Sequence, residues 1–136
     1  MTAIGLISDV HATPAPVEEA LSIFRQAGVN EIFCAGDIAG YRQRLRETVA
    51  LLIDNACLTV VGNHDLLYMD SNKNAIDNEI MRFFMQLPTS INLSLAGKRI
   101  YMVHAQPPDA CHGGIKLLNR NGLLQNDRIA YWKNAL

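Results

Sequence analysis

Three short apolar runs separated by helix-like segments constrain the fold of this chain more than any other feature. The runs cover residues 3–8, 31–35 and 57–61. Strands that are buried on both faces of a parallel sheet have this nearly continuous apolar composition. The intervening segments repeat apolar residues at helical spacing, at residues 14–27, 43–55 and 75–86. The order strand, helix, strand, helix, strand, helix predicts an α/β fold built on a parallel sheet.

The pattern changes in the second half of the chain. Residues 91–95 and 99–103 are two further strand-like runs, and Ala96-Gly97-Lys98 between them predicts a hairpin. A last helix is expected at residues 127–136. Because the chain shows no internal repeat, low-complexity tract or linker, we expect residues 1–136 to form a single domain.

Metal-binding residue types follow the end of every predicted strand. In chain order they are Asp9 and His11, then Asp37, then Asn63, His64 and Asp65, and finally His104 after the hairpin. Ligands of open parallel sheets bind at the carboxyl ends of the strands, so these four groups are expected to converge.

The donor set favours two divalent metal ions. Two ions about 4 Å apart need a shared anionic ligand to stay together, and Asp37 is the expected bridge. Asp9 and His11 would complete the ligands of one ion, whereas Asn63 and His104 would complete those of the other. Oxygen and imidazole donors without thiolate suit manganese, iron or zinc.

His64 has a different expected role, because it would stand beside the metals without binding them. Oriented by Asp65, its ring could stabilise a bound phosphate or protonate the leaving oxygen. These two residues are therefore the candidate catalytic pair.

The order and separation of these motifs resemble those of the calcineurin-like metallophosphoesterases, in particular the compact bacterial type. The matching motifs are D-V-H at residues 9–11, G-D at 36–37, G-N-H-D at 62–65 and His104. The resemblance implies a four-layer α/β/β/α sandwich and an enzyme that hydrolyses phosphomonoesters or phosphodiesters, including nucleotides, with a dinuclear metal centre and a bridging hydroxide. It also implies two divalent ions, with manganese as first choice and iron, zinc or nickel as alternatives.

One motif of the family is missing. No G-H-x-H follows His104, and His112 is the single later histidine. We therefore expect a C-terminally incomplete version of the domain, either a natural truncation or a fragment, with three protein ligands for each ion. His112 could replace a lost ligand, although an ordinary loop histidine is the preferred interpretation.

Several alternatives stay open at this stage. The chain could be a catalytically weak or inactive phosphoesterase-like scaffold that acts as a protein-interaction module. Two chains could also form a homo-oligomer by exchanging terminal elements, since an incomplete sheet leaves an exposed edge. Arg42, Arg44 and Arg46 could contact a phosphate, but a solvated helix face is preferred, and Tyr41 could line a substrate cleft.

Composition excludes some partners. The net charge of −1 provides no field that would gather nucleic acid or an anionic membrane. The chain has no apolar stretch approaching the roughly 20 residues needed to cross a bilayer, and its start lacks the basic leader of a secretory signal. Its three cysteines are widely spaced, which predicts reduced thiols in a cytoplasmic protein.

Overall fold

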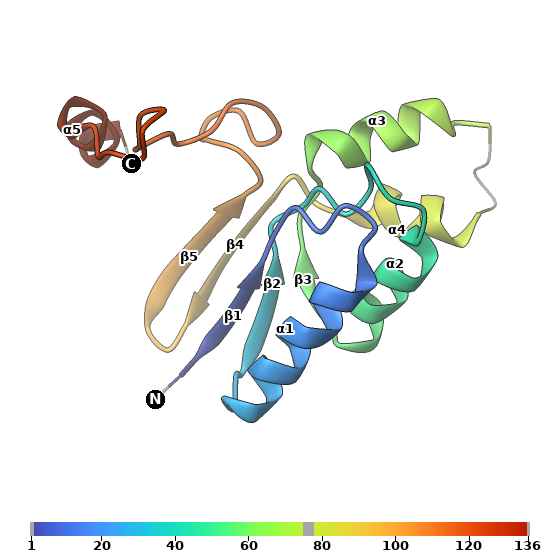
Figure 1. The fold of residues 1–136 in the computed structure, drawn as a ribbon. Coiled ribbons are helices and arrows are strands. Elements are labelled where there is room, and N and C mark those ends of the chain that lie inside the picture. Colours follow the sequence, from blue (N-terminus) through green and yellow to red (C-terminus); the bar gives the residue numbers. More distant parts are fainter. Residues whose placement is uncertain (1, 75–77, 136) are drawn as a thin grey trace.

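A three-stranded parallel sheet lies between a layer of helices and a β-hairpin in the computed structural model, which describes residues 2–74 and 78–135 (Figure 1). The elements in chain order are β1 Ile4–Ile7, α1 Pro14–Gln26, β2 Glu31–Cys34, α2 Leu45–Asp54, β3 Leu58–Thr59, α3 Asn63–Ser71, α4 Glu79–Gln86, β4 Ser90–Leu95, β5 Lys98–Val103 and α5 Asn126–Ala135.

The parallel sheet has the strand order β1-β2-β3, so strands that follow one another in the chain are neighbours in space. The register between β1 and β2 pairs Ile4 with Glu31 and Ile7 with Cys34, and β3 continues the sheet through the pair Phe33 and Leu58. All three strands run in the same direction and therefore bring their carboxyl ends to one edge. This arrangement confirms the predicted α/β fold.

The helical layer buries one face of the sheet. Val17 and Leu21 of α1, Leu52 of α2 and Phe84 of α4 are buried in one hydrophobic cluster with Cys34 of β2. The apolar positions of α1 and α2 recur at helical spacing and face this cluster, which is why these two segments form amphipathic helices against the sheet.

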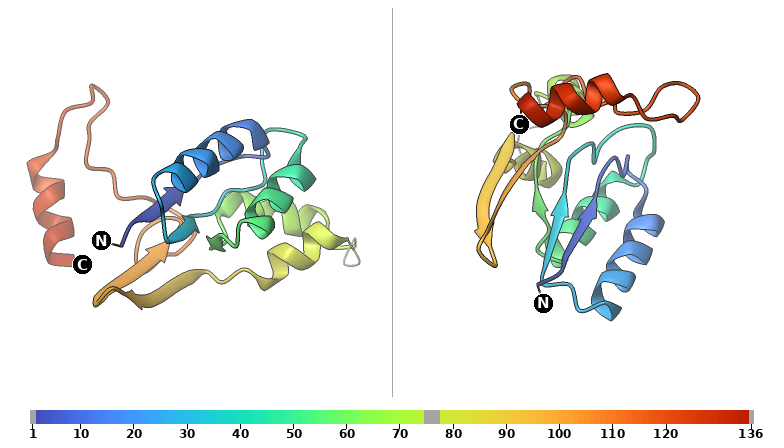
Figure 2. Two further views of the ribbon diagram at one scale, coloured as in Figure 1. Left: turned by 90° about the horizontal axis from the view of Figure 1, so that it is seen from below. Right: turned by 90° about the vertical axis from the view of Figure 1, so that its left-hand side faces the viewer.

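The hairpin of β4 and β5 covers the opposite face. Phe33 and Val60 meet Met102 of β5 in a second cluster, with Ile91 and Leu93 of β4 packed against it. Figure 2 shows the hairpin and the helices α1 and α2 on opposite sides of the parallel strands. The two sheets pack face to face, so three layers follow the order helix, sheet, sheet.

The outer face of the hairpin is exposed. Asn92, Ser94 and Tyr101 alternate with the core-facing residues, and Tyr101 is 55% exposed. α5 lies beyond the carboxyl end of β5 rather than over this face (Figures 1 and 2). The described residues therefore form three layers of the expected four-layer sandwich, without a helical layer on the hairpin.

Sequence reasoning missed the helix α3. No helix was predicted between the strand at residues 57–61 and the helix at 75–86, but residues 63–65 form the first turn of α3. A local signal was present, because Gly62 precedes the helix and Asp65, three residues later, accepts a hydrogen bond from the Gly62 backbone N–H at 2.9 Å. The next helix was expected at residues 75–86; the structure begins α4 at Glu79, and residues 75–77 lie outside the described residues.

Buried thiols explain the widely spaced cysteines. Cys34, Cys57 and Cys111 are free. Burial raises the pKa of Cys34 to about 12 and that of Cys57 to about 11. Because the thiolate is the reactive form, these two cysteines serve as small apolar side chains. Among the described residues, no helix has the length and apolar character needed to cross a membrane.

Candidate metal centre

The loops that follow β1 and β2 are joined to each other by their main chains. The backbone N–H groups of Asp9 and His11 donate to the carbonyl oxygens of Gly36 and Asp37, both at 3.0 Å. Ala12 N–H continues the series by donating to the Ile38 carbonyl at 2.7 Å. These bonds extend the pairing of the two strands into the loops, so the first two predicted ligand groups are held side by side.

Asp37 lies at the centre of the predicted ligands. Its carboxylate oxygens are 3.5 Å from His104 Nε2 and 4.0 Å from both His11 Nε2 and His64 Nε2. The residue is only 3% exposed, and its Oδ1 accepts a hydrogen bond from the His64 backbone N–H at 2.9 Å. That N–H belongs to the first turn of α3, where the helix dipole stabilises a carboxylate.

His104, which directly follows β5 of the hairpin, lies beside the Asp37 carboxylate. Its Nε2 lies 3.0 Å from Asn63 Oδ1, and its Nδ1 lies 2.7 Å from the Ala35 carbonyl oxygen. Potential ligand atoms of Asp9, Asp37 and His104 all lie within 4.8 Å of one another. The four groups expected to converge at the sheet edge therefore meet in space.

The surroundings of the His104 ring fit a bound cation. Both ring nitrogens face oxygen atoms, of Ala35 on one side and of Asn63 and Asp37 on the other. A neutral imidazole can donate only one hydrogen bond. A cation between Nε2 and the two side-chain oxygens would satisfy the second nitrogen, and the carboxylate favours positive charge there.

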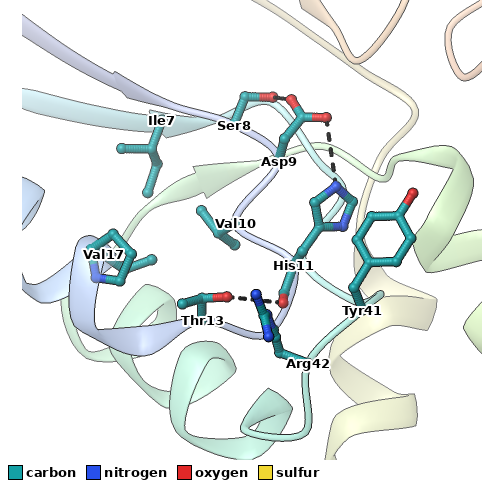
Figure 3. A pocket seen from close by; sticks show the side chains of 10 residues that line it. Ile7, Ser8, Asp9, Val10, His11, Thr13, Val17, Tyr41 and Arg42 are labelled. Atoms are coloured by element: carbon teal, nitrogen blue, oxygen red, sulfur yellow. Dashed lines mark hydrogen bonds and ion pairs between the residues drawn. The ribbon is translucent and has the colours of Figure 1, made fainter.

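His11 has the same type of support. Its Nδ1 lies 2.9 Å from the Ala39 carbonyl oxygen, and its Nε2 lies 4.0 Å from a carboxylate oxygen of Asp37. The same Nε2 lies 4.0 Å from an Asp9 carboxylate oxygen (Figure 3). A carbonyl partner on one nitrogen fixes the tautomer and directs the other nitrogen towards a metal, as is usual for metal-binding histidines.

The backbone at this site is strained. Asp9, His11 and Asp37 have φ angles of 54°, 42° and 55°, in the left-handed region that residues other than glycine seldom adopt. Such conformations persist only where surrounding contacts hold them, and they cluster at functional sites. Here the hydrogen bonds between the two loops supply those contacts.

Asp65 has a structural role that differs from its expected pairing with His64. Its side chain is fully buried, and Oδ1 accepts from the backbone N–H groups of Ile38 and Ala39 at 2.8 and 2.7 Å. Oδ2 accepts from Gly62, as described above. Burial raises the pKa of this carboxyl, while the three backbone donors oppose the change. Asp65 thus ties the Asp37 loop to the start of α3.

Tyr41, rather than Asp65, contacts the His64 ring. The Tyr41 hydroxyl lies 3.2 Å from His64 Nε2, and the Tyr41 ring also packs against His11 with a centroid distance of 4.7 Å. Tyr41 is 74% exposed, so it stands at the mouth of the site. The sequence left its role open, and no local signal links Tyr41 to His64, because the two residues come from different elements.

His112 lies apart from this group. Its ring is paired with Asp109 at 3.6 Å, and its backbone N–H donates to the same carboxylate at 2.8 Å. The backbone donors of His112 and Cys111 lower the pKa of Asp109. These contacts define a local loop, in agreement with the preferred interpretation of His112.

Gly40 allows His11 to approach closely. A Cβ at this position would collide with His11 Nδ1, and the φ of +138° is itself unfavourable for other residues. We predict that Gly40→Ala displaces the His11 ring, lowers metal affinity about tenfold or more and costs about 1–3 kcal/mol of unfolding free energy. Metal titration and urea unfolding would check both effects.

Gly97→Ala is the matched control. Gly97 also has a positive φ, of +74°, but a Cβ there would meet no atom within 4 Å. This variant should lose stability without losing metal affinity. Equal metal affinities for the two variants would show that Gly40 is not needed to place His11.

The fold and the clustered carboxylate, amide and imidazole groups define an α/β protein with a candidate metal centre at the carboxyl edge of its parallel sheet. Residues 2–128 match the family model of the calcineurin-like phosphoesterase superfamily domain. The chain therefore belongs to the calcineurin-like phosphoesterases, as its motifs indicated.

Individual relatives agree with this assignment. An uncharacterized protein of Methanocaldococcus jannaschii is 35% identical over 120 residues, covering 76% of this chain and 49% of that protein. A metallophosphoesterase from Sphaerobacter thermophilus has a TM-score of 0.64 at 28% identity, covering 85% of this chain and 52% of that one. The chain thus spans about half the length of these two relatives.

A further solved structure supports the fold alone. A hypothetical protein from Pyrococcus horikoshii has a TM-score of 0.69 at 15% identity, and the match covers 99% of this chain and 66% of that one.

Proposed function

We propose that this chain is the metal-binding part of a phosphoester hydrolase, acting on a phosphodiester or phosphomonoester. The observation that supports the proposal best is the convergence of side chains from three other segments, at residues 9–11, 63–65 and 104, around the buried carboxylate of Asp37. Membership of the calcineurin-like family supports the same reaction class.

The proposed ligands are those expected from the sequence. Asp9 and His11 would hold one divalent ion, Asn63 and His104 would hold the other, and Asp37 would be shared between them. When bound, divalent ions lower the pKa of a water molecule and neutralise negative charge on the phosphoryl group. Manganese is our first choice, with iron, zinc or nickel as alternatives, because oxygen and imidazole donors accept each of these metals.

His64 is the proposed catalytic residue. Its side chain is 25% exposed, so the ring can reach a substrate, and its backbone is fixed to Asp37. From this position the ring can donate a hydrogen bond to a phosphoryl oxygen or to the leaving oxygen. Asp65 would act indirectly, through the loop and helix start that it joins.

We further propose one domain over residues 1–136, a small phosphoester or nucleotide substrate, and a cytoplasmic location, for which the free thiols are the supporting observation. An inactive scaffold that binds another protein is the alternative. It is disfavoured by His64, which lies beside the proposed ligands.

Elemental analysis combined with a hydrolysis assay distinguishes the proposed hydrolase from the inactive scaffold. Protein purified without chelator is expected to contain about two divalent ions per chain and to hydrolyse bis(p-nitrophenyl) phosphate. Chelation should abolish turnover, and added manganese should restore it. A folded, metal-free protein that shows no turnover after metal addition would favour the scaffold.

A further inference from the structure

Three arginines follow the Asp37 loop at alternate positions, and the structure separates one from the other two. Arg44 forms an ion pair with Glu47, and Arg46 Nη1 lies 3.1 Å from Glu79 Oε2. These two ion pairs agree with the interpretation that Arg44 and Arg46 belong to a solvated helix face. Within residues 2–74 and 78–135, Arg42 has neither an ion pair nor a side-chain hydrogen bond.

Arg42 instead lines the pocket beside the metal centre. The pocket has a volume of about 560 Å³, a size typical of small-molecule sites. Asp9 and His11 form the side of the pocket nearest the proposed metals, and Tyr41 and Arg42 lie at its border (Figure 3). The other walls are largely apolar, from Ile7, Val10, Pro16 and Val17. A substrate at the metal centre would therefore extend over an apolar surface towards a guanidinium group.

We propose that Arg42 determines specificity by binding a second anionic group, a carboxylate or phosphate carried by the part of the substrate that occupies this pocket. This inference rests on the proposed function and narrows its substrates to phosphoesters that carry a second anionic group. An arginine suits this task because its planar guanidinium can donate two parallel hydrogen bonds to a carboxylate or phosphate.

The local field supports an anion in this pocket. Thr13, which directly precedes α1, also lines it, and the first turn of α1 contains no acidic residue. The positive end of the helix dipole therefore has no acidic side chain in its first turn to neutralise it, and the acidic residues Glu18 and Glu19 come only after that turn. The carboxylate of Asp9 is the negative group of the pocket, and it belongs to the proposed metal ligands.

A pair of matched ligands tests the proposal by direct binding. Phenylphosphonate and 4-carboxyphenylphosphonate share the phosphonate and the ring and differ by one carboxylate. Their dissociation constants would be measured by calorimetry on the full, manganese-loaded chain. We expect the carboxylated ligand to bind the wild-type protein about fivefold more tightly or better, the size of one exposed charge-assisted contact.

Substitutions of Arg42 and Arg44 test whether Arg42 causes the preference for the carboxylated ligand. Arg42→Gln should reduce the ratio of the two dissociation constants to about one, and Arg42→Lys should give an intermediate ratio because it keeps the charge but loses the planar fork. Arg44→Gln is the control and should keep the wild-type ratio. A wild-type protein that binds neither ligand, or does not prefer the carboxylated one, overturns the proposal, and so does an unchanged ratio in Arg42→Gln.

Hydrolysis of bis(p-nitrophenyl) phosphate by the wild-type protein is scored separately. Absence of this turnover in the wild-type protein counts against the proposed function, whereas the role of Arg42 is judged only from the binding of the two phosphonates.

Discussion

Asp37→Asn is expected to remove metal binding and hydrolysis while leaving the fold intact. The carboxylate lies within 4.0 Å of three histidine rings and is the proposed shared ligand of both ions. Loss of a supporting group usually costs about 10- to 100-fold in metal affinity or activity, and loss of the shared ligand should cost at least 100-fold. Metal content per chain and turnover of bis(p-nitrophenyl) phosphate are the measurements.

The asparagine keeps the oxygen that accepts the His64 backbone N–H, so the unfolding free energy should change little. Asp54→Asn, on the exposed end of α2, is the control and should retain both metal and activity. Full activity in Asp37→Asn would rule out a mechanism that depends on two metals sharing this carboxylate.

Asp65→Ala should have the largest effect on stability. It leaves three buried backbone N–H groups, of Ile38, Ala39 and Gly62, without their acceptor. An unsatisfied buried donor costs about 1–3 kcal/mol, so we expect a loss of roughly 3 kcal/mol or more, even if water reaches some of them. For a chain of this size the melting temperature should fall by about 10 °C.

Two further variants make this prediction specific. Asp65→Asn keeps the acceptor for Ile38 and Ala39 but presents an N–H₂ group to Gly62, so its loss of stability should be smaller. Asp70→Ala removes an exposed carboxylate from the same helix and should be nearly neutral. If Asp65→Ala were no less stable than Asp70→Ala, Asp65 would not be the tie between the Asp37 loop and α3.

Prediction from the sequence was most successful where one residue pattern determines both the type of an element and where its neighbouring polar residues lie. The apolar runs predicted β1 and β2, and the polar residues directly after them were correctly expected to converge. The metal-binding and catalytic roles of those residues stay predictions. The expected burial of both faces was wrong for β1, which is an edge strand with Leu6 61% exposed. The hairpin was found from two strand-like runs on either side of Ala96-Gly97-Lys98, although β4 and β5 are separated by two residues instead of three.

The contacts between side chains were harder to predict from the sequence. Asp65 was paired with its neighbour His64 by chain order, but the first turn of α3 directs its carboxylate into the protein, towards the loop after β2. In the same way, the sequence separates the three arginines only in part: Glu47 is placed to pair with Arg44 at the i,i+3 spacing, but nothing local indicates a partner for Arg46. Their difference depends on the positions of Glu47 and Glu79, and Glu79 is on a distant helix.

The main-chain bonds between the loops after β1 and β2 have a consequence for how this site can evolve. Since peptide groups, not side chains, join Asp9, His11 and Ala12 to residues 36–38, these bonds do not depend on the side chains of the loops, and the positive φ angles are what limits the choice of residue. A descendant could exchange one ligand for another, or lose them all, and still present the same two adjoining loops.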